Sequence, residues 1–387
     1  MSEIVIVADT RTPIGAFNGS LANTPGIELC AAAMKACVEK SGIPIDQFDS
    51  VYVGNVISAG VGQNPAKQAS LAAGFPCSTP CTLVNKVCCS SMKALQIGAT
   101  EIKVGDSKAV MIGGFESMSR CPHLLQNSRN GYRLGNFTTV DSLINDGLWD
   151  ARYNMHMGQL VDNLNAKLGI SREEQDRFAI QSFDRAAKAW EEHCFDGQIV
   201  PIQTKTGEYK VDESIYKLRR EKVPVLKPSF SPTGTITPAN ASGLSDGAAA
   251  LAICSSEFAA EHNLKPIAKI LSFGESGIDP AEFPLAPADA VKKALSKVHL
   301  TTSDIDLWEF NEAFASVPLM LINSLGLSED KVNILGGAVA IGHPLGCSGI
   351  RIVTTLIAGL KHRGLKRGCA ALCNGGGGGN CVIIEML

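Results

Sequence analysis

The sequence lacks the features that would assign it to a membrane or to nucleic acid. No apolar run approaches the roughly 18 to 20 residues that are needed to span a bilayer. Acidic and basic residues are interspersed, and the formal net charge is only −3. Because Lys and Arg do not gather on one face, the charge pattern does not favour nucleic acid or an anionic membrane surface as a partner. We therefore expect an ordinary soluble globular protein.

The N-terminal sequence also predicts no targeting segment. The strand pattern EIVIVAD begins almost at Met1, so neither a signal peptide nor an Arg- and Ser-rich transit segment is predicted. The thirteen cysteines are an odd number, and without a secretory signal we expect thiols in a reducing compartment, the cytoplasm or the mitochondrial matrix. Cys77 and Cys81 have a spacing that could suit zinc, but no matching His or Cys pair completes a tetrahedral set.

The sequence does contain an internal repeat. The segment Cys89–Lys93 (CSSMK) aligns with Cys347–Arg351 (CSGIR), and the apolar positions that follow fall on one helix face in both copies. Upstream, Val51–Asn55 (VYVGN) aligns with Leu307–Asn311 (LWEFN). Apolar strand runs alternate with helical patterns, which indicates an α/β protein with a parallel or mixed sheet covered on both faces. With 387 residues, 45% of them hydrophobic, the chain can bury a sizeable core.

A different kind of sequence separates the two copies. From about residue 120 to residue 245 the apolar runs become sparse, although a capping box of Ser171 and Glu174 opens a helix that is predicted to reach about Cys194. This part also contains a basic stretch, made of Lys205, Lys210, Lys217, Arg219, Arg220, Lys222 and Lys227. Such a stretch is either a solvated loop or a surface that meets phosphates.

The domain organisation follows from this division. We predict that residues 1–119 and 246–265 form the N-terminal half of the core and that residues 266–387 form the C-terminal half. Residues 120–245 would be an inserted loop domain. The segment GLSDGAAALAICS, which follows the insertion, is typical of a turn and a buried strand that returns to the first half.

Four loops carry residues that could do chemistry. Cys88 follows the strand CTLVN and precedes a helix, where amide donors and the helix dipole would lower the pKa of its thiol. Asn311 follows a strand, and His343 is presented by a glycine-rich run. Cys373 ends a strand and precedes NGGGGG, whose amides are free to point at an anion. Each residue also has a structural interpretation, since buried cysteines, turn-capping asparagines and structural histidines are common.

In this order, the motifs resemble the signature loops of the thiolase family. They are NKVCCSSMKAL (from Asn85), NEAFA (from Asn311), GGAVAIGHPLGCSG (from Gly336) and CNGGGG (from Cys373). The resemblance runs from RTPIGAF at Arg11 to the C-terminus. It implies a five-layered αβαβα fold with two similar halves and an inserted loop domain. The details ANASG and NGGGGG are similar to the acetyl-CoA acetyltransferase branch, closest to its mitochondrial type.

The resemblance implies a role for each loop. Cys88 would be the nucleophile that carries the acetyl group, and His343 would take its proton and donate to the thioester oxygen, with Asn311 helping through a water molecule. Cys373 would be the acid and base at the α-carbon, and the amides of Cys88 and Gly375 would bind the second oxyanion. The implied reaction is the reversible condensation of two acetyl-CoA to acetoacetyl-CoA. Coenzyme A is then a substrate or product, and no covalently bound cofactor is expected.

The resemblance also implies binding sites outside the catalytic loops. The acyl-CoA substrate would contact His156, Met157, Phe230, Ala241, Ser242 and Phe314, and the basic stretch would lie near the CoA phosphates. A potassium ion, as in the mitochondrial-type enzymes, would lie near Tyr216, Ala239, Ala241 and Val339, although Pro238 replaces a usual Ala. Family members are dimers or tetramers, so we expect a homodimer or homotetramer, with Cys121–Asp146 as a tetramer-forming loop.

One dipeptide bears on substrate choice. Phe283 and Pro284 match a dipeptide that resembles the mitochondrial acetoacetyl-CoA thiolases, which also handle 2-methylacetoacetyl-CoA. Proline would fix the backbone and the ring would form a stiff wall beside the α-carbon, with room for one methyl group. The alternative is a surface turn with an incidental aromatic residue.

Several positions depart from the family pattern. Cys89 stands in place of a usual Ala or Gly, Ser91 in place of Gly, Leu335 in place of Asn, and Cys347 in place of Ala or Met. Ser91 would crowd the turn below the nucleophile, which would affect the rate rather than the reaction type. Two other functions stay open: a degradative 3-ketoacyl-CoA thiolase of longer chains, and a non-catalytic acyl-CoA or lipid-binding protein.

Overall fold

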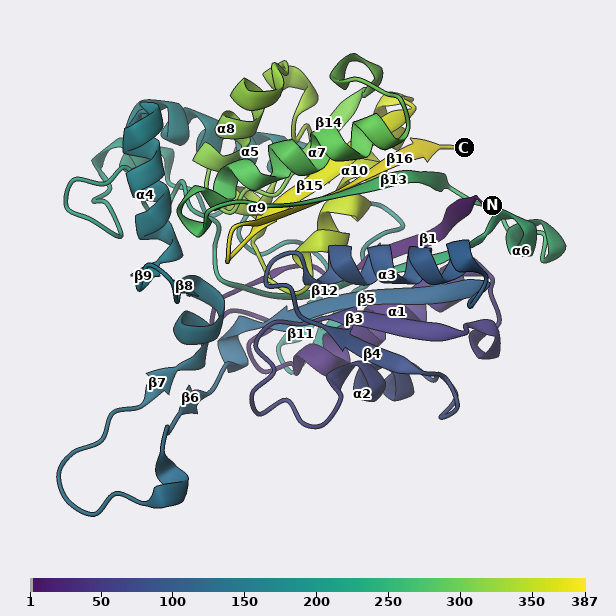
Figure 1. The fold of residues 1–387 in the computed structure, drawn as a ribbon, viewed down its shortest axis with the longest axis horizontal. Helices are drawn as coiled ribbons and strands as arrows, with labels where there is room; N and C mark the ends of the chain where they lie inside the picture. Colours follow the sequence, from purple (N-terminus) through teal and green to yellow (C-terminus); the bar gives the residue numbers. More distant parts are fainter. Residues whose placement is uncertain (1–2) are drawn as a thin grey trace.

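The computed structural model describes residues 3–387, and its strands form one long mixed sheet (Figure 1). In spatial order the strands are β14 (Leu307–Phe310), β15 (Arg367–Asn374), β16 (Gly378–Met386), β13 (Ala268–Gly277), β1 (Ile4–Arg11), β12 (Ser245–Ser255), β5 (Ala109–Ser117), β3 (Ser50–Gly54) and β4 (Cys81–Val84). The short strand β2 (Gly15–Ala16) pairs with the start of β12.

This sheet consists of two halves with the same strand pattern. In the N-terminal half β3 runs parallel to β5, while β12 is antiparallel to both β5 and β1. In the C-terminal half β14 runs parallel to β15, while β16 is antiparallel to both β15 and β13. Only the short pairing of Ile4–Ile6 with Ala268–Ile270 joins β1 to β13. The internal repeat predicted from the sequence is therefore present in the fold.

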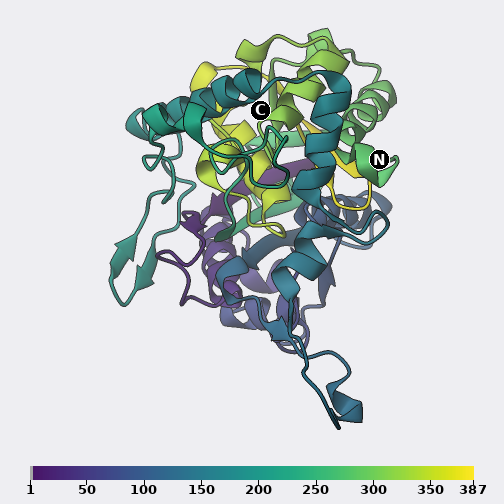
Figure 2. The same cartoon turned by 90° about the vertical axis from the view of Figure 1, so that its left-hand side faces the viewer.

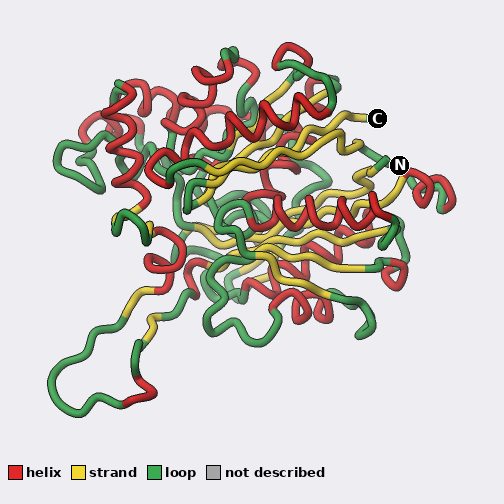
Figure 3. The backbone as a smooth tube through the Cα atoms, viewed as in Figure 1, coloured by secondary structure: helices red, strands yellow, loops and turns green. Residues whose placement is uncertain are grey.

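Helices cover both faces of each half and so create five layers. The outer helices are α1 (Gly26–Ser41) and α2 (Pro65–Ala72) on the N-terminal half, and α7 (Ala286–Lys297) and α8 (Ser316–Leu325) on the C-terminal half. Helices α3 (Ser90–Val104) and α10 (Ser348–Arg363) form the central layer, because one hydrophobic cluster joins them to strands of both halves. In Figures 1 and 3 the C-terminal half lies above the N-terminal half. The predicted αβαβα architecture is confirmed.

The central helices are built by equivalent sequences. Their inward faces are Met92, Leu95, Ala99 and Ile102 in α3, and Ile350, Val353, Ile357 and Leu360 in α10, all buried. Both helices end at a glycine in the left-handed conformation, Gly105 (φ 88°) and Gly364 (φ 61°), which stops the helix without side-chain strain. The first turns of the two helices contact each other, because Ser91 of α3 hydrogen-bonds to Cys347 and Ile350 at the start of α10, so the loops that precede both helices meet.

The insertion folds over this end. It contains the helices α4 (Met157–Leu168) and α5 (Arg172–Glu191), the π-helix η4 (Leu143–Leu148), and the short hairpins β6 (His123–Leu124) with β7 (Val140–Asp141), β8 (Trp149–Asp150) with β9 (Met155–His156), and β10 (Ile202–Thr204) with β11 (Gly207–Tyr209). The predicted capping box of Ser171 and Glu174 opens α5. The β6–β7 hairpin projects far from the body, as the view in Figure 2 shows.

The chain then returns to the first half, because β12 inserts between β1 and β5. Helix α6 (Ser256–Glu261) follows β12, and α9 (Ala338–Ile341) precedes the glycine-rich loop before α10. The domain boundaries proposed from the sequence, 1–119 with 246–265, 120–245 and 266–387, stay a prediction. Within residues 3–387, none of the helices combines the length and apolar character that a membrane span requires.

Candidate active site

A cavity of about 470 Å³ lies where loops of both halves meet the inserted domain. Most residues that the sequence analysis proposed line it: Cys88, His156, Met157, Phe230, Ala241, Ser242, Phe283, Phe314, His343, Cys373 and Gly375. Asn311 is buried one layer behind the wall, in contact with His343. Pro284 is buried next to Phe283 in the 3₁₀ helix η6 (Pro280–Leu285). Residues that are far apart in the sequence therefore surround one space of the size that suits a small-molecule ligand.

Cys88 sits on a tight turn between β4 and α3. The preceding residue, Val87, has φ +48°, a conformation that is strained for a β-branched residue. The Ser90 hydroxyl holds the turn, since it accepts a hydrogen bond from the Lys86 amide (2.9 Å) and donates one to the Val87 carbonyl (2.6 Å). This turn directs Cys88 into the cavity while Cys89, the N-cap residue of α3, is fully buried.

The pKa of the Cys88 thiol differs from the expectation. Burial raises the pKa of Cys88 to about 12, although the backbone amides of Gly375 and of Cys88 itself point at the sulfur and oppose this effect. The sequence-based prediction of a lowered pKa is therefore wrong for the resting site, because the loss of water outweighs the amide donors. The same two amides form a pair of donors of the kind that stabilises an oxyanion.

The imidazole of His343 is fixed in one orientation. Its Nδ1 lies 2.6 Å from the Ser348 hydroxyl, which itself donates to the Pro344 carbonyl at 2.9 Å. The hydroxyl must then accept a hydrogen bond from Nδ1–H, which leaves Nε2 unprotonated, 3.3 Å from Asn311 Nδ2. Burial, with the nearby charge of Arg351, lowers the pKa of His343 to about 3. The imidazole is thus neutral near pH 7, and its unprotonated Nε2, which accepts a hydrogen bond from Asn311, can accept a proton.

Cys373 lines the same cavity and lies near the end of β15. Its side chain is 1% exposed, and burial together with the neighbouring Cys88 raises the pKa of its thiol. The glycines that follow turn the chain sharply into β16, since Gly376 (φ 84°) and Gly377 (φ 83°) are both left-handed. This hairpin brings the amide of Gly375 to the sulfur of Cys88.

Aromatic side chains form one wall of the cavity. The ring of His156 stacks on Phe230, with centroids 4.6 Å apart, and Phe230 meets Phe314 edge-on at 6.3 Å. Ala241 forms an isolated β-bridge with Phe314, and the Ser242 hydroxyl donates to the Ala313 carbonyl at 2.9 Å. Phe283 is only 3% exposed and belongs to the lining, so the alternative of a surface turn is wrong.

Comparison with known families identifies the chain. The N-terminal domain of thiolases matches residues 4–257, and the C-terminal domain of thiolases matches residues 264–386. The chain belongs to the thiolase family. This thiolase is 45% identical to a cytosolic acetyl-CoA acetyltransferase of Gibberella zeae over 99% of its own length and 98% of the relative. It is also 45% identical to the mitochondrial acetyl-CoA acetyltransferase of Mus musculus, over 100% of this chain and 92% of the relative.

Solved structures of other thiolases have the same fold. The thiolase Acat5 of Ascaris suum, solved in complex with coenzyme A, superposes with a TM-score of 0.95 at 42% identity and full coverage of both chains. Human mitochondrial 3-ketoacyl-CoA thiolase superposes with a TM-score of 0.96 at 38% identity, covering 100% of this chain and 99% of the human one. The fold alone therefore does not distinguish an acetyl-CoA acetyltransferase from a 3-ketoacyl-CoA thiolase.

The residues proposed for potassium only partly come together in this thiolase. Ala239, Ala241 and Val339 line a second cavity of about 340 Å³. Tyr216 is not among its lining residues, and its side chain is 61% exposed. The same cavity is lined by Lys217, Arg219 and Lys222. Three cationic side chains favour a phosphate over a cation there, so the potassium ion stays a prediction without support from this geometry.

Sequence reasoning missed part of the site. The additional lining residues are Met118, Ile144, Gly147, Leu148, Ser229, Pro238, Gly243, Leu244, Ala313 and Leu345. Leu345 and Ala313 could have been found, because they lie inside the signature loops GHPLG and NEAFA. Ile144 and Leu148 belong to η4 in the insertion, where no periodic pattern marks them. Ser348, which orients His343, stands five residues after it at the start of α10, and no sequence pattern marks it.

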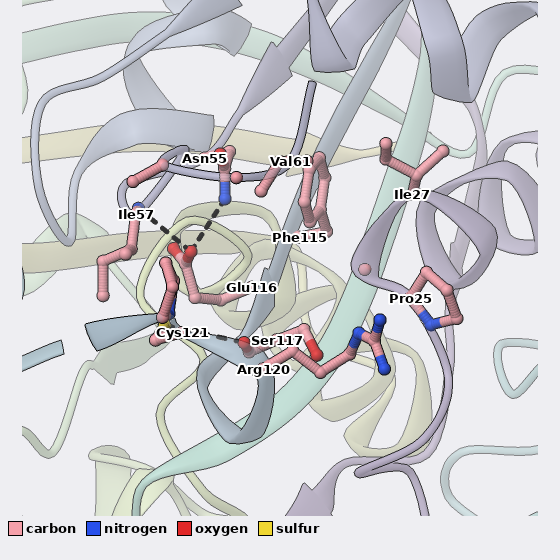
Figure 4. A pocket seen from close by; sticks show the side chains of 14 residues that line it. Pro25, Ile27, Asn55, Ile57, Val61, Phe115, Glu116, Ser117, Arg120 and Cys121 are labelled. Carbon is pink, nitrogen blue, oxygen red and sulfur yellow. Dashed lines mark hydrogen bonds between the residues drawn. The ribbon is translucent and has the colours of Figure 1, made fainter. Parts of the chain in front are cut away.

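A buried carboxyl group lies in the lining of a separate pocket, next to the loop that carries His343 (Figure 4). Glu116, at the end of β5, accepts hydrogen bonds from Asn55 Nδ2 (2.7 Å) and from the amides of Val56 (3.0 Å), Ile57 (3.1 Å) and Gly346 (2.9 Å). Burial raises the pKa of Glu116 to about 7 despite these donors. The carboxylate thereby ties the loop after β3 to the loop that carries the imidazole.

Two residues that depart from the family pattern, Ser91 and Cys89, lie outside the cavity lining. The Ser91 hydroxyl donates to the Cys347 carbonyl at 3.1 Å and accepts from the Ile350 amide at 3.1 Å. Ser91 therefore joins the first turns of α3 and α10 rather than crowding the nucleophile turn. Cys89 donates to the Leu372 carbonyl at 3.5 Å and lies away from the cavity lining.

Proposed function

We propose that this thiolase is an acetyl-CoA C-acetyltransferase that interconverts two acetyl-CoA with acetoacetyl-CoA and free CoA. The observation that carries the proposal is the shared cavity of Cys88, His343 and Cys373, with the Gly375 amide aimed at the nucleophile. Two thiols and one neutral imidazole are the groups that a Claisen condensation between thioesters requires. The names of the relatives at 45% identity support the same reaction.

In the first half-reaction, Cys88 takes the acetyl group. The thiol proton passes to Nε2 of His343 as the sulfur attacks the thioester carbon, and the imidazolium then stabilises the oxygen that becomes negative, together with Asn311. The intermediate collapses with cleavage of the bond to the CoA sulfur. Cys373 protonates the departing CoA thiolate, which leaves Cys373 as a thiolate and Cys88 as a thioester.

In the second half-reaction, the Cys373 thiolate removes an α-proton from a second acetyl-CoA. The resulting carbanion attacks the carbonyl of the acetylated Cys88, and the amides of Cys88 and Gly375 hold the negative oxygen. The new carbon–carbon bond forms, the bond to the Cys88 sulfur breaks, and His343 returns its proton to that sulfur. A raised pKa suits Cys373 here, because a thiolate of high pKa is a stronger base toward a weakly acidic carbon.

A direct assay distinguishes the three candidate functions, which are an acetyl-CoA acetyltransferase, a degradative 3-ketoacyl-CoA thiolase and a non-catalytic acyl-CoA-binding protein. Purified protein is mixed with acetoacetyl-CoA and CoA, and loss of the absorbance of the ketothioester is followed. We expect rapid cleavage that Cys88→Ala abolishes and that Cys89→Ala, its neighbour outside the cavity, largely retains. Faster cleavage of a longer 3-ketoacyl-CoA would instead indicate a degradative thiolase. Binding of acyl-CoA without cleavage would indicate a non-catalytic protein.

The substrate preference rests on Phe283 and Pro284. We propose that this thiolase also cleaves 2-methylacetoacetyl-CoA, because the buried ring of Phe283 forms part of the cavity wall and Pro284 holds it rigidly. One methyl group changes the relative transition-state binding of two substrates by only ~1 to 3 kcal/mol, so the shape of the cavity wall can determine whether the 2-methyl substrate is accepted. Replacing the pair by Met-Gly should lower the rate with the 2-methyl substrate far more than with the unbranched one. Failure of the wild-type protein to cleave the 2-methyl substrate would contradict the assignment.

The second cavity offers a place for the CoA phosphates. It shares Pro238, Ala241 and Gly243 with the catalytic cavity, so one extended ligand could occupy both. Arg219 and Lys222 line it, whereas the adjacent Arg220 pairs with Asp184. Charge reversal of Arg219 or Lys222 to Glu should raise the KM for CoA with little effect on kcat. Arg220→Glu is the matched control, and an equal rise there would contradict phosphate binding at this cavity.

We further propose that the β6–β7 hairpin mediates assembly into a tetramer. Its tip presents Leu134, which is fully exposed, together with Phe137 (56%), Tyr132 (43%) and Leu125 (41%). Apolar side chains gathered on a projecting hairpin are typical of an interaction surface. Changing these four residues to Ser should convert a tetramer into a dimer, as measured by light scattering. An unchanged mass would locate the interface elsewhere.

A further inference from the structure

A group of metal-binding side chains lies apart from the two cavities, where the end of α5 meets the last turn of α10. Glu192, Cys194 and His362 bring their ligand atoms within 4.8 Å of one another, and no other such group is found in residues 3–387. Nε2 of His362 lies 3.5 Å from a carboxylate oxygen of Glu192. All three side chains are reachable from solvent, since Glu192 and His362 are 42% and 35% exposed and Cys194 is half-buried.

The backbone explains why the three donors converge. Helix α5 ends at Glu191, and Glu192 is its C-cap residue. His193 then adopts a left-handed conformation (φ 57°), which reverses the chain, and the Cys194 amide donates to the Ala189 carbonyl at 2.9 Å. This closed turn holds the carboxylate and the thiol on the same side of α5, opposite His362 of α10.

We propose that Glu192, Cys194 and His362 bind a divalent cation of the zinc class, with water as the fourth ligand. A thiolate, an imidazole and a carboxylate are the donor types that zinc prefers, and three protein ligands with one open position are typical of an accessible site. Sequence spacing gives no sign of this site, because the imidazole comes from a helix far along the chain. The exposed Lys188 competes for Glu192 at 3.6 Å, so binding should be weaker than at a closed four-cysteine site.

The bound cation would join the inserted domain to the C-terminal half behind the active site. Ser182 of α5 donates to a carboxylate oxygen of Glu312 at 2.6 Å and accepts from the Gly337 amide at 3.0 Å. Glu312 belongs to the signature loop that carries Asn311, and Gly337 belongs to the one that carries His343. Fixing the end of α5 against α10 would therefore stiffen the support of these loops, and the folded protein should gain stability from the metal.

Cobalt(II) is the probe, because its bond to a thiolate produces a charge-transfer absorption band. The titration uses full-length protein with Cys88→Ala, which removes the accessible catalytic thiol. We expect one equivalent of cobalt to produce the band and zinc to displace it. Cys194→Ser should abolish the band, and His362→Gln and Glu192→Gln should each weaken binding at least tenfold. Cys77→Ser, an exposed thiol elsewhere, and His193→Asn, which removes the neighbouring imidazole but tolerates the left-handed conformation of the turn, are the matched controls and should leave binding unchanged.

Thermal unfolding gives a second readout that does not depend on the charge-transfer absorption band. Zinc should raise the unfolding temperature of the Cys88→Ala protein, and this rise should be lost in the His362→Gln variant. The proposal is overturned if no charge-transfer band forms, if the band survives in Cys194→Ser, or if the His193→Asn control loses binding as strongly as His362→Gln.

Discussion

Ser348 is predicted to control catalysis through the imidazole of His343. Its hydroxyl accepts the Nδ1–H hydrogen bond at 2.6 Å, and this contact keeps Nε2 free to accept a proton. In Ser348→Ala the buried Nδ1–H loses its partner, since His343 is only 5% exposed and water cannot easily replace the hydroxyl. The imidazole can then rotate or take the other tautomer, in which Nε2 carries the proton and cannot act as the base.

The size of the effect follows from the lost contact. An unpaired buried polar group costs about 1 to 3 kcal/mol, which corresponds to roughly a 5- to 150-fold lower kcat if the cost falls on the reactive arrangement. KM should change little, because Ser348 does not line the cavity that would hold the substrate. The measurement is kcat and KM for thiolysis of acetoacetyl-CoA, with urea unfolding of each variant.

Thr354→Val is the matched control. Thr354 lies on the same helix, is fully buried, and donates its hydroxyl to the Arg351 carbonyl at 2.8 Å, just as Ser348 donates to Pro344. Both variants therefore lose one buried hydroxyl that bonds to a carbonyl, but only Ser348 contacts the imidazole. Equal losses of kcat in the two variants, or a kcat within twofold of wild type in Ser348→Ala, would refute the orienting role.

Further outcomes are expected from three other residues. Cys373→Ser should still be acetylated at Cys88 but should fail to exchange the α-protons of acetyl-CoA; equal loss of both reactions would show that Cys373 acts elsewhere. Alkylation of Cys88 by iodoacetamide should rise about tenfold per pH unit from pH 7 to 9, because its pKa is about 12, and acetyl-CoA should protect it; a plateau below pH 8 would contradict the raised pKa. Folding raises the pKa of Glu116 from 4.5 to about 7, so the folded protein loses stability relative to the unfolded chain as pH rises from about 4.5 through 7. Urea midpoints of the wild type should fall over this pH range, and those of Glu116→Gln should lack this fall. The variant should also have a lower kcat.

Much of the fold was predictable because both halves repeat one pattern. The apolar faces of α3 and α10 follow a helical period, and the strands before them carry continuous apolar runs, so local sequence determines the elements and their layers. The capping box at Ser171 could also be predicted, since its partner Glu174 is three residues away. These signals are local in the chain and do not depend on how distant parts meet.

The rest depends on contacts between distant segments. The raised pKa of Cys88 arises from burial, and a sequence pattern indicates the amide donors but not how completely water is excluded. Glu116 illustrates the same limit. It accepts three hydrogen bonds from the loop after β3 in the first half and one from the Gly346 amide in the second half, and the sequence does not show that these loops meet. Tyr216 was associated with an ion by resemblance, yet its exposed position follows from the path of an irregular loop that has no periodic signal.

The protonation states of the site indicate how it can hold two thiols side by side. Burial raises the pKa of both thiols and so keeps them protonated, and the neighbouring Cys88 raises the pKa of Cys373 further. A neutral His343 adds no charge at rest. A thiolate can therefore form only when its proton has a destination, either His343 or the leaving CoA sulfur. In the mechanism we propose, the burial that keeps Cys88 protonated at rest would also make a Cys373 thiolate, once formed, a stronger base toward the α-carbon, and the raised pKa values would couple the two half-reactions in sequence.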